Sequence, residues 1–445
     1  MKIKTEFLLP ALVLFSNHCQ AFDWLLQPDF SATERYTDNL RMQITPTRDN
    51  LITTLSPGLL LGYIAENQEL KTSFKWNELI YHGESELDFS EKIANASHQF
   101  NAERFKTDLS AQYAEQSSIN TQLDPEGSGN LQIQVPRTTR SVSPGITYNL
   151  TEQNAVQLGY NYVDVKFDTT ESLADNLGFS DYDNQQFSAT FIHTYSERLS
   201  FNLTGAYSKF NSSNDSSNSR SFITFIPAPP FLVGLNQSRT TSYEQSSTTL
   251  FYQAGLQYLF DEQTQFSLSA GMRETENRTR YSQIVTFNPE YPPYITNPEP
   301  TEINDTSTAS GHVFSANLTR NSEWGGFTLN AGQQLNPSSS GSQQQSTTFS
   351  ANLRYNLSER WTTGVTASYL MSESTSTLNN NSNISNNRTY TTLTPNIRWR
   401  WTPEINLELS YSYRQQEFDA LGQTAIGNNL QLQFSYQPLI NRQVK

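Results

Sequence analysis

Residues 143–163 read SPGITYNLTEQNAVQLGYNYV, and this stretch decides the fold class of the chain. Apolar and polar residues alternate on both sides of the short polar group T-E-Q-N. Alternation with a period of two places one set of side chains on each face of a strand, and so short a connection joins antiparallel strands. The stretch therefore predicts a β-hairpin with one apolar and one polar face.

The same unit recurs along the chain. Clear copies are FIHTYSERLSFNLTGAY at 191–207, LQYLFDEQTQFSLSAG at 256–271, NLRYNLSERWTTGVTASY at 352–369 and NIRWRWTPEINLELSYSY at 396–413. Weaker copies are GYIAENQELKTSF, FNAERFKTDLSAQY and LTRNSEWGGFTLNAG. Each has a strand, a tight polar connection and a second strand, so the sequence predicts eight tight connections.

Longer segments rich in Ser, Asn, Gly and Pro separate these hairpins. They lie at about 117–139, 168–183, 211–239, 282–310, 336–343, 374–387 and 418–428. Strict alternation of short and long connections is typical of a transmembrane barrel with short periplasmic turns and long extracellular loops. We therefore predict an all-β, antiparallel, up-and-down transmembrane β-barrel of about 18 strands, within a range of roughly 16 to 20.

The N-terminus has the composition of an export signal. Lys2 and Lys4 precede an apolar run and a polar stretch that ends at Ala21, which is typical of a signal peptide over residues 1–21. Residues 22–445 are then predicted to be one barrel domain, located in the outer membrane of a Gram-negative cell. The one cysteine, Cys19, precedes the predicted cleavage site, so we expect no disulfide, thiolate metal site or catalytic cysteine in the mature chain.

The alternating faces are compatible with a membrane barrel or with a soluble β-sandwich. Leu407, Leu409 and Tyr411 share one face, opposite Glu408 and Ser410. Polar residues on the other face and an amphipathic last strand favour the membrane. So do aromatic residues at the strand ends beside the short turns, as an interfacial girdle requires; these are Tyr148, Tyr195, Tyr258, Phe260, Tyr355, Trp361, Trp399 and Trp401.

A barrel of this size is wide enough for an aqueous channel. The strand periodicity predicts that a basic patch with neighbouring polar residues lines the pore: Arg354, Arg398, Arg400, Glu408, Arg414, Asn352, Gln431 and Gln433. Such a patch would concentrate an anionic solute in a chain whose formal net charge is -14. The alternative is a set of structural ion pairs near the turns.

Two Pro-rich segments combine stiffness with aromatic residues: SFITFIPAPPFLVGLN at 221–236 and IVTFNPEYPPYITNPEP at 284–300. One interpretation is that they fold over the pore and stack on sugar rings. The other is that they pack at the rim against each other or against lipopolysaccharide. The aromatic residues in question are Phe222, Phe225, Phe231, Phe287, Tyr291 and Tyr294.

ERYTDNL, ITTLSPGLLLGY and the repeated strands of the type SPGITYNLTEQNAVQLGYNY resemble a family of outer-membrane β-barrel porins associated with exopolysaccharide and exosortase-type systems. The resemblance covers essentially residues 22–445. It implies a conduit for export of a secreted or capsular polysaccharide, with membrane lipids, lipopolysaccharide and a periplasmic or outer-membrane export protein as partners. No site residue is carried over from the family.

Other functions remain open. A general diffusion porin or a structural, adhesive barrel that displays its loops fits the same pattern. We expect no enzyme and no cofactor, because the sequence has no G-x-S-x-G, phosphate loop or zinc spacing. His193 and His312 are predicted to face outward, and an acidic exported chain is not expected to bind nucleic acid.

Overall fold

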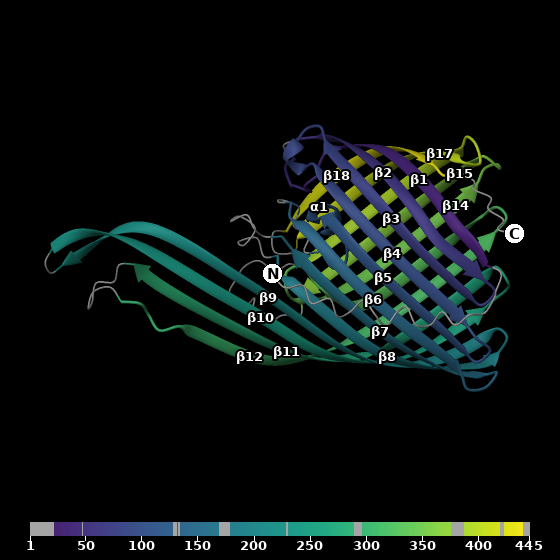
Figure 1. The fold of residues 1–445 in the computed structure, drawn as a ribbon, viewed down its shortest axis with the longest axis horizontal. Coiled ribbons are helices and arrows are strands. Elements are labelled where there is room, and N and C mark those ends of the chain that lie inside the picture. Colours follow the sequence, from purple (N-terminus) through teal and green to yellow (C-terminus); the bar gives the residue numbers. More distant parts are fainter. Residues whose placement is uncertain are drawn as a thin grey trace.

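A computed structural model of the chain describes residues 22–46, 48–127, 131, 134–168, 179–227, 230–288, 296–374, 387–418 and 422–438. The predicted signal peptide lies outside these residues. Eighteen antiparallel strands form one sheet in which each strand pairs with its sequence neighbours and β1 also pairs with β18 (Figure 1). The sheet therefore closes on itself as a barrel, and the fold class and the strand number predicted from the sequence are confirmed.

The strands have the following bounds: β1 Phe22–Thr37, β2 Asn50–Ala65, β3 Gln68–Tyr81, β4 Phe89–Asn101, β5 Phe105–Ser117, β6 Pro136–Asn149, β7 Asn154–Phe167, β8 Asp181–Ser196, β9 Leu199–Pro227, β10 Pro230–Leu259, β11 Thr264–Asn288, β12 Thr301–Ser322, β13 Gly325–Pro337, β14 Gln343–Asn356, β15 Trp361–Ser374, β16 Arg388–Arg400, β17 Ile405–Phe418 and β18 Gln423–Tyr436. Two single helical turns, η1 (Ser85–Leu87) and α1 (Ser118–Thr121), lie between strands. Among the described residues no helix is long and apolar enough to cross a membrane.

Five of the eight tight connections share a local cause. In the β6–β7 turn the hydroxyl oxygen of Thr151 accepts hydrogen bonds from the backbone amides of Gln153 and Asn154, at 3.3 and 3.0 Å. Such a bond pins a turn because the side chain replaces a backbone partner. Four further turns repeat it, with Ser196, Asp261, Ser358 and Thr402 as the acceptors. In these five turns a short polar side chain at the first turn position therefore ends the run of alternation.

The outward face is apolar. Leu409, Tyr411, Leu430 and Leu432 are 43 to 52% exposed, although hydrophobic side chains of this size are usually buried. At the periplasmic rim, Trp361 stacks on Trp399 with ring centroids 5.7 Å apart. An exposed apolar band with aromatic side chains at its margin matches a hydrocarbon layer and its interface.

Two segments predicted to be loops are strands instead. Residues 211–227 and 230–239 belong to β9 and β10, and residues 282–288 and 301–310 belong to β11 and β12. These four strands continue beyond the barrel as an arm (Figure 1). The prediction was wrong here because both faces of the arm contact water, so Ser, Thr and Asn replace the apolar half of the alternation. Most of 418–428 is likewise strand, in β18.

Pro57, Pro144 and Pro395 lie within strands, where the loss of a ladder hydrogen bond can cause a bulge or bend. Each strand keeps the same register on both sides of its proline, for example Leu55 opposite Glu78 and then Gly58 opposite Lys75. Only the pairing at the proline and the residue before it is missing, because proline has no amide hydrogen to donate. The one register shift in the described sheet lies at Thr194/Ser196.

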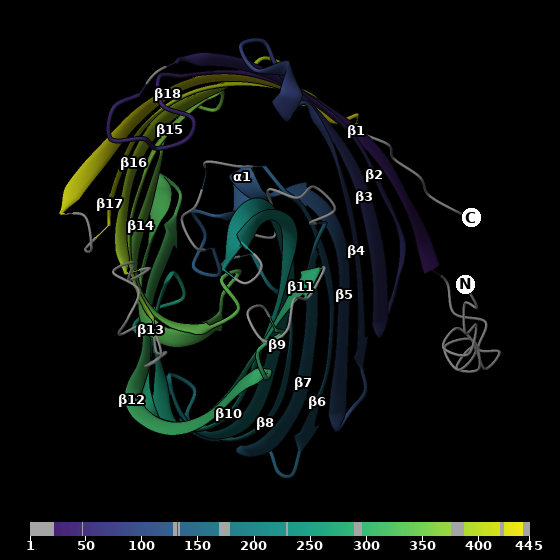
Figure 2. The same cartoon turned by 90° about the vertical axis from the view of Figure 1, so that its left-hand side faces the viewer.

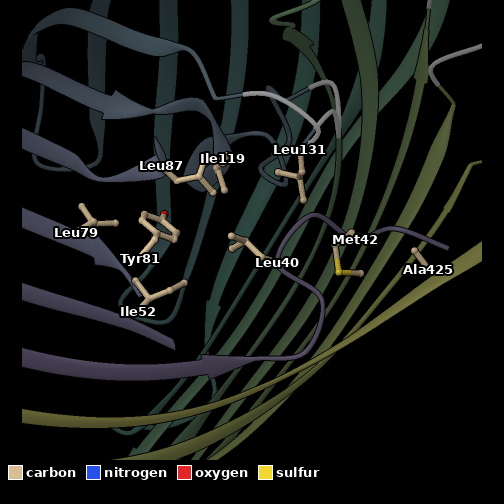
Figure 3. Packing of buried hydrophobic residues seen from close by; sticks show 9 residues of the cluster. All are labelled: Leu40, Met42, Ile52, Leu79, Tyr81, Leu87, Ile119, Leu131 and Ala425. Carbon is tan, nitrogen blue, oxygen red and sulfur yellow. The ribbon is translucent and has the colours of Figure 1, made fainter. Parts of the chain in front are cut away.

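Apolar side chains also gather inside the barrel, at the extracellular end. Ile52, Leu79 and Tyr81 project from β2 and β3 and pack against side chains of three connecting segments (Figure 3). Those are Leu40 and Met42 after β1, Leu87 in η1, and Ile119 and Leu131 between β5 and β6. All are 0 to 7% exposed, so this cluster fixes the segments to the inner wall.

Candidate functional site

The residues predicted to line the pore lie on the inward face of β14, β16, β17 and β18. Arg398 pairs across the sheet with Glu408, which pairs with Gln433, and their chain neighbours Leu409 and Leu432 face outward. Arg354, Arg400, Asn352 and Gln431 have the same parity. This wall therefore presents guanidinium and amide groups to the lumen.

Two of these arginines have different surroundings. Arg398 donates from Nε (2.8 Å) and Nη2 (2.6 Å) to Glu408, and its side chain is 56% exposed to the lumen. Arg414 is 8% exposed and donates to the Thr37 hydroxyl at 3.1 Å and the Asn39 carbonyl at 3.0 Å. Arg414 thus holds the segment after β1 near the mouth, whereas Arg398 lies deeper, beside the periplasmic rim.

The opposite wall is polar and nearly uncharged. Thr147, Gln157, Thr190, Thr204 and Gln253 lie opposite one another in consecutive strands from β6 to β10. Their chain neighbours Leu158, Phe191, Leu203 and Tyr252 are 41 to 60% exposed on the outer surface, and side chains alternate along a strand, so these five residues face inward. Within the barrel wall, Arg273 is the one charged side chain among the described inward residues of β7 to β12. Hydroxyl and amide groups can donate and accept hydrogen bonds without attracting ions strongly.

The outer mouth is crossed by residues 118–127, which we call the crossing segment. It leaves β5, begins with α1, and lies inside the ring of strands (Figure 2). Its contacts reach β14 and β16 on the far side of the ring. Arg388 of β16 donates from Nη2 to the carbonyls of Asp124 and Gly127, both at 2.9 Å, and the Ser346 hydroxyl of β14 donates to the Pro125 carbonyl at 3.3 Å.

Further bonds hold the crossing segment at its middle. The backbone amide of Ser339, in the β13–β14 connection, donates to the Glu126 carbonyl at 3.0 Å, and its hydroxyl donates to Gln122 Oε1 at 2.8 Å. Glu126 also pairs with Arg137 of β6 at 3.1 Å. Ser339 and Gln122 are 2% and 1% exposed. The mouth is therefore closed in part by a packed, hydrogen-bonded segment.

Two residues of the crossing segment depend closely on their surroundings: Gly127 for its backbone turn and Asp124 for its protonation. A Cβ atom on Gly127 would lie 2.2 Å from the backbone oxygen of Gln122, so only glycine fits this turn. Burial raises the pKa of the Asp124 carboxyl, and the nearby Arg137 and Arg388 guanidinium groups only partly offset this effect.

Four of the six predicted loop aromatics lie in strands rather than in loops over the pore. Phe222 and Phe225 belong to β9 and Phe231 to β10, in the arm that projects away from the barrel (Figure 1). Their side chains lie outside the described set, as do residues Tyr291 and Tyr294. Phe287 lies near the end of β11, opposite Gln237 of β10. Sugar stacking by these rings stays a prediction.

Sequence reasoning missed the residues that close the mouth, Arg388, Ser339 and the 118–127 segment. The alternation of inward and outward residues along the strands did contain a sign of these contacts. Ile52, Leu79 and Val165 are apolar residues at inward positions that are otherwise polar, and all three are at most 4% exposed. An apolar inward residue near the extracellular end indicates a connecting segment that folds into the lumen.

No protein-family model and no curated protein sequence matches this chain. Solved outer-membrane β-barrels are similar in structure at very low sequence identity. The ferric-catecholate import receptor Fiu of E. coli K12 has 9% identity and a TM-score of 0.43, with 92% of this chain and 81% of that chain covered. The outer membrane protein opdK of Pseudomonas aeruginosa has 10% identity and a TM-score of 0.39, with 93% and 99% covered.

A structure described as a bacterial polysaccharide outer membrane secretin has 9% identity and a TM-score of 0.32, with 93% of this chain and 99% of that chain covered. Similarities at this level carry no argument about function, which has to come from the residues of this chain. Among those described, no group of three or more His, Asp or Glu side chains is placed to hold a metal ion.

Proposed function

We propose that the protein is an outer-membrane channel through which a secreted polysaccharide leaves the cell, and that the crossing segment gates its outer mouth. The observation that carries the proposal is the uncharged row of hydroxyl and amide side chains from β6 to β10, in a barrel of 18 strands. A polyhydroxylated chain can exchange hydrogen bonds along such a wall without a deep binding site. Transport needs binding that is weak enough for release.

The opposite wall favours an acidic polymer. Arg354, Arg398 and Arg400 face the lumen, and Glu408 neutralises only one of them by a direct pair. Basic groups in a low-dielectric channel concentrate anions. Export driven from the inner membrane needs no energy source in this chain, so we propose a periplasmic or outer-membrane export protein as the partner that delivers the polymer.

A general diffusion porin is the second candidate, because the lumen is polar and wide. The crossing segment favours a regulated channel over this alternative, because it is bonded to both walls of the mouth. A structural or adhesive barrel is supported by the projecting arm, but that role gives no reason for the polar lining.

The test is a narrowing substitution with a matched control on the opposite face. Thr204→Trp places a large ring in the lumen, whereas Leu203→Trp places it outside, where Leu203 is 60% exposed. In a deletion strain that still synthesises polysaccharide, we expect wild type and Leu203→Trp to restore surface polymer and Thr204→Trp to leave it in the periplasm. Equal export by all three proteins would contradict a conduit through the lumen.

A further inference from the structure

On the outer surface of the barrel, a charged area lies on β7 to β12 just beyond the extracellular edge of the apolar band. One cross-strand row contains Asp164, Asp183, Asn211, Ser246, Arg278 and Thr306. The next row toward the extracellular side contains Lys166, Asp181, Ser213, Glu244, Arg280 and Asn304. All twelve side chains are polar, and together they line a hollow of about 630 Å³ that we call the outer hollow.

The outer hollow lies at the level of lipid headgroups. Asp164 is ten residues beyond Asn154, the first residue of β7, which is roughly 34 Å along a strand. A strand tilt of about 40° reduces this to about 26 Å along the barrel axis, close to the roughly 25 Å height of an outer-membrane apolar band. The exposed rings of Phe187, Tyr207 and Tyr252 lie just below, on the same outward face. The outer hollow thus begins where the hydrocarbon ends.

Lys166, Arg278 and Arg280 supply the positive charge in the outer hollow. The Arg278 side chain is 70% exposed and pairs with Glu276 at 2.8 Å, and the Arg280 side chain is 57% exposed and pairs with Glu302 at 3.9 Å. These pairs are weak because both partners are solvated, so the guanidinium groups remain free to bind another anion. Guanidinium binds phosphate through two parallel hydrogen bonds, which makes arginine a preferred phosphate ligand.

The acidic side chains favour a ligand that also carries hydroxyl groups or bridging cations. Asp164 lies directly opposite Asp183 on one side and Arg140 of β6 on the other, and Asp181 is two residues from Asp183 in the same strand. Like charges that face each other across a sheet are unfavourable unless a cation or donor lies between them. A phosphate alone would not suit this side of the outer hollow, whereas sugar hydroxyls and divalent cations would.

The same level on the other side of the barrel has no comparable group. Beyond the outward-facing Phe349 and Tyr369, the outward positions of β14 to β16 are Gln345, Thr347, Met371, Glu373, Thr389 and Thr391, none of which is basic. At this level the basic outward residues therefore lie between β4 and β11, where Lys92 and Arg140 continue the same two rows, and not on β14 to β16.

We propose that the outer hollow binds the phosphorylated sugar headgroup of a glycolipid in the outer leaflet, with Arg278 and Arg280 contacting phosphate and the aspartates contacting sugar hydroxyls or a bridging divalent cation. The site is independent of the lumen and of the proposed export function. It places a lipid against the base of the arm formed by β9 to β12 (Figure 1).

The experiment measures binding of diphosphoryl lipid A to the purified barrel in detergent. The test variant is Arg278→Gln/Arg280→Gln; its side chains are exposed, so folding is retained. The control Arg320→Gln/Arg360→Gln removes the same charge at the periplasmic rim. We expect Kd to rise about 30-fold in the test variant. This estimate takes about 1 kcal/mol of binding free energy for each of the two basic residues near a lipid surface. In the control we expect Kd to change less than about twofold.

Four outcomes would overturn the proposal. One is an unchanged Kd in the test variant, and a second is an equal loss in the control. The third is equal affinity for lipid A from which both phosphates have been removed. Competition by free glucosamine 1-phosphate at the same concentration would assign the outer hollow to a soluble sugar phosphate and would also overturn the lipid assignment.

Discussion

Arg388 is the residue whose loss should release the crossing segment. Its side chain is 1% exposed, and its Nη2 donates to the carbonyls of Asp124 and Gly127 across the mouth. Hydrogen bonds from a charged donor contribute about 1.5–3 kcal/mol each. Two such bonds give roughly 3–6 kcal/mol before the cost of burying the guanidinium is counted.

That cost is substantial here. Among the described residues, Nε and Nη1 of Arg388 have no hydrogen-bond partner, so part of the charge is desolvated without compensation. We therefore expect a net contribution of about 1–2 kcal/mol to the closed state, or roughly a tenfold change in the ratio of open to closed channels. Arg388→Met keeps the apolar stem, removes both bonds, and should raise the open probability about tenfold.

The assay is single-channel recording in a planar bilayer. Arg398→Met is the matched control, because Arg398 faces the same lumen but pairs with Glu408 and has no bond to the crossing segment. It should change ion selectivity and leave the open probability unchanged. An open probability that Arg388→Met leaves at the wild-type level, or that both variants raise equally, would refute the reasoning.

Three further predictions follow from the same geometry. Gly127→Ala should destabilise the closed mouth by about 1–3 kcal/mol, because the added methyl group meets the Gln122 backbone. Protease cleavage within residues 118–127 should therefore be faster than in wild type, and an unchanged cleavage rate would contradict this. The pKa of Asp124 is raised in the closed state, so closure is favoured below the ordinary Asp pKa and this contribution is lost as pH rises through the raised value. Open probability should therefore be lower near pH 4 than near pH 7 for wild type, but not for Asp124→Asn, where a persisting difference would point to another group. Glu408→Gln should shift the reversal potential in a KCl gradient toward anion selectivity, because it leaves Arg398 unneutralised; a shift toward cations would be the opposite of what the pair implies.

The barrel could be predicted from the sequence because its cause is local and repeated. Most strands within the membrane alternate, and Thr151, Ser196, Asp261, Ser358 and Thr402 each end a run with the same side-chain bond. The order of strands then follows from sequential pairing. These features need no knowledge of distant contacts.

The arm and the closed mouth could not be predicted in the same way. Along most of the arm neither strand face is apolar, so residues 211–221, which are mainly Ser and Asn, had the composition of a loop. Contacts across the mouth join residues far apart in sequence, such as Arg388 with Gly127, and no short motif marks them. The alternation predicted that the pore residues face inward. It could not predict that Arg414 is buried while Arg398 is exposed to the lumen, because Arg414 is covered by the segment after β1.

A reversible crosslink between Glu126→Cys and Ser339→Cys tests the gate most directly. The backbone amide of Ser339 donates to the Glu126 carbonyl at 3.0 Å, which brings the two backbones close enough for a disulfide, and Cys19 is absent from the predicted mature chain. In the Arg388→Met background, the oxidised channel should show a lower open probability and a smaller conductance than wild type without the crosslink, and reduction should raise both. Equal conductance in both redox states would show that the crossing segment does not gate the lumen.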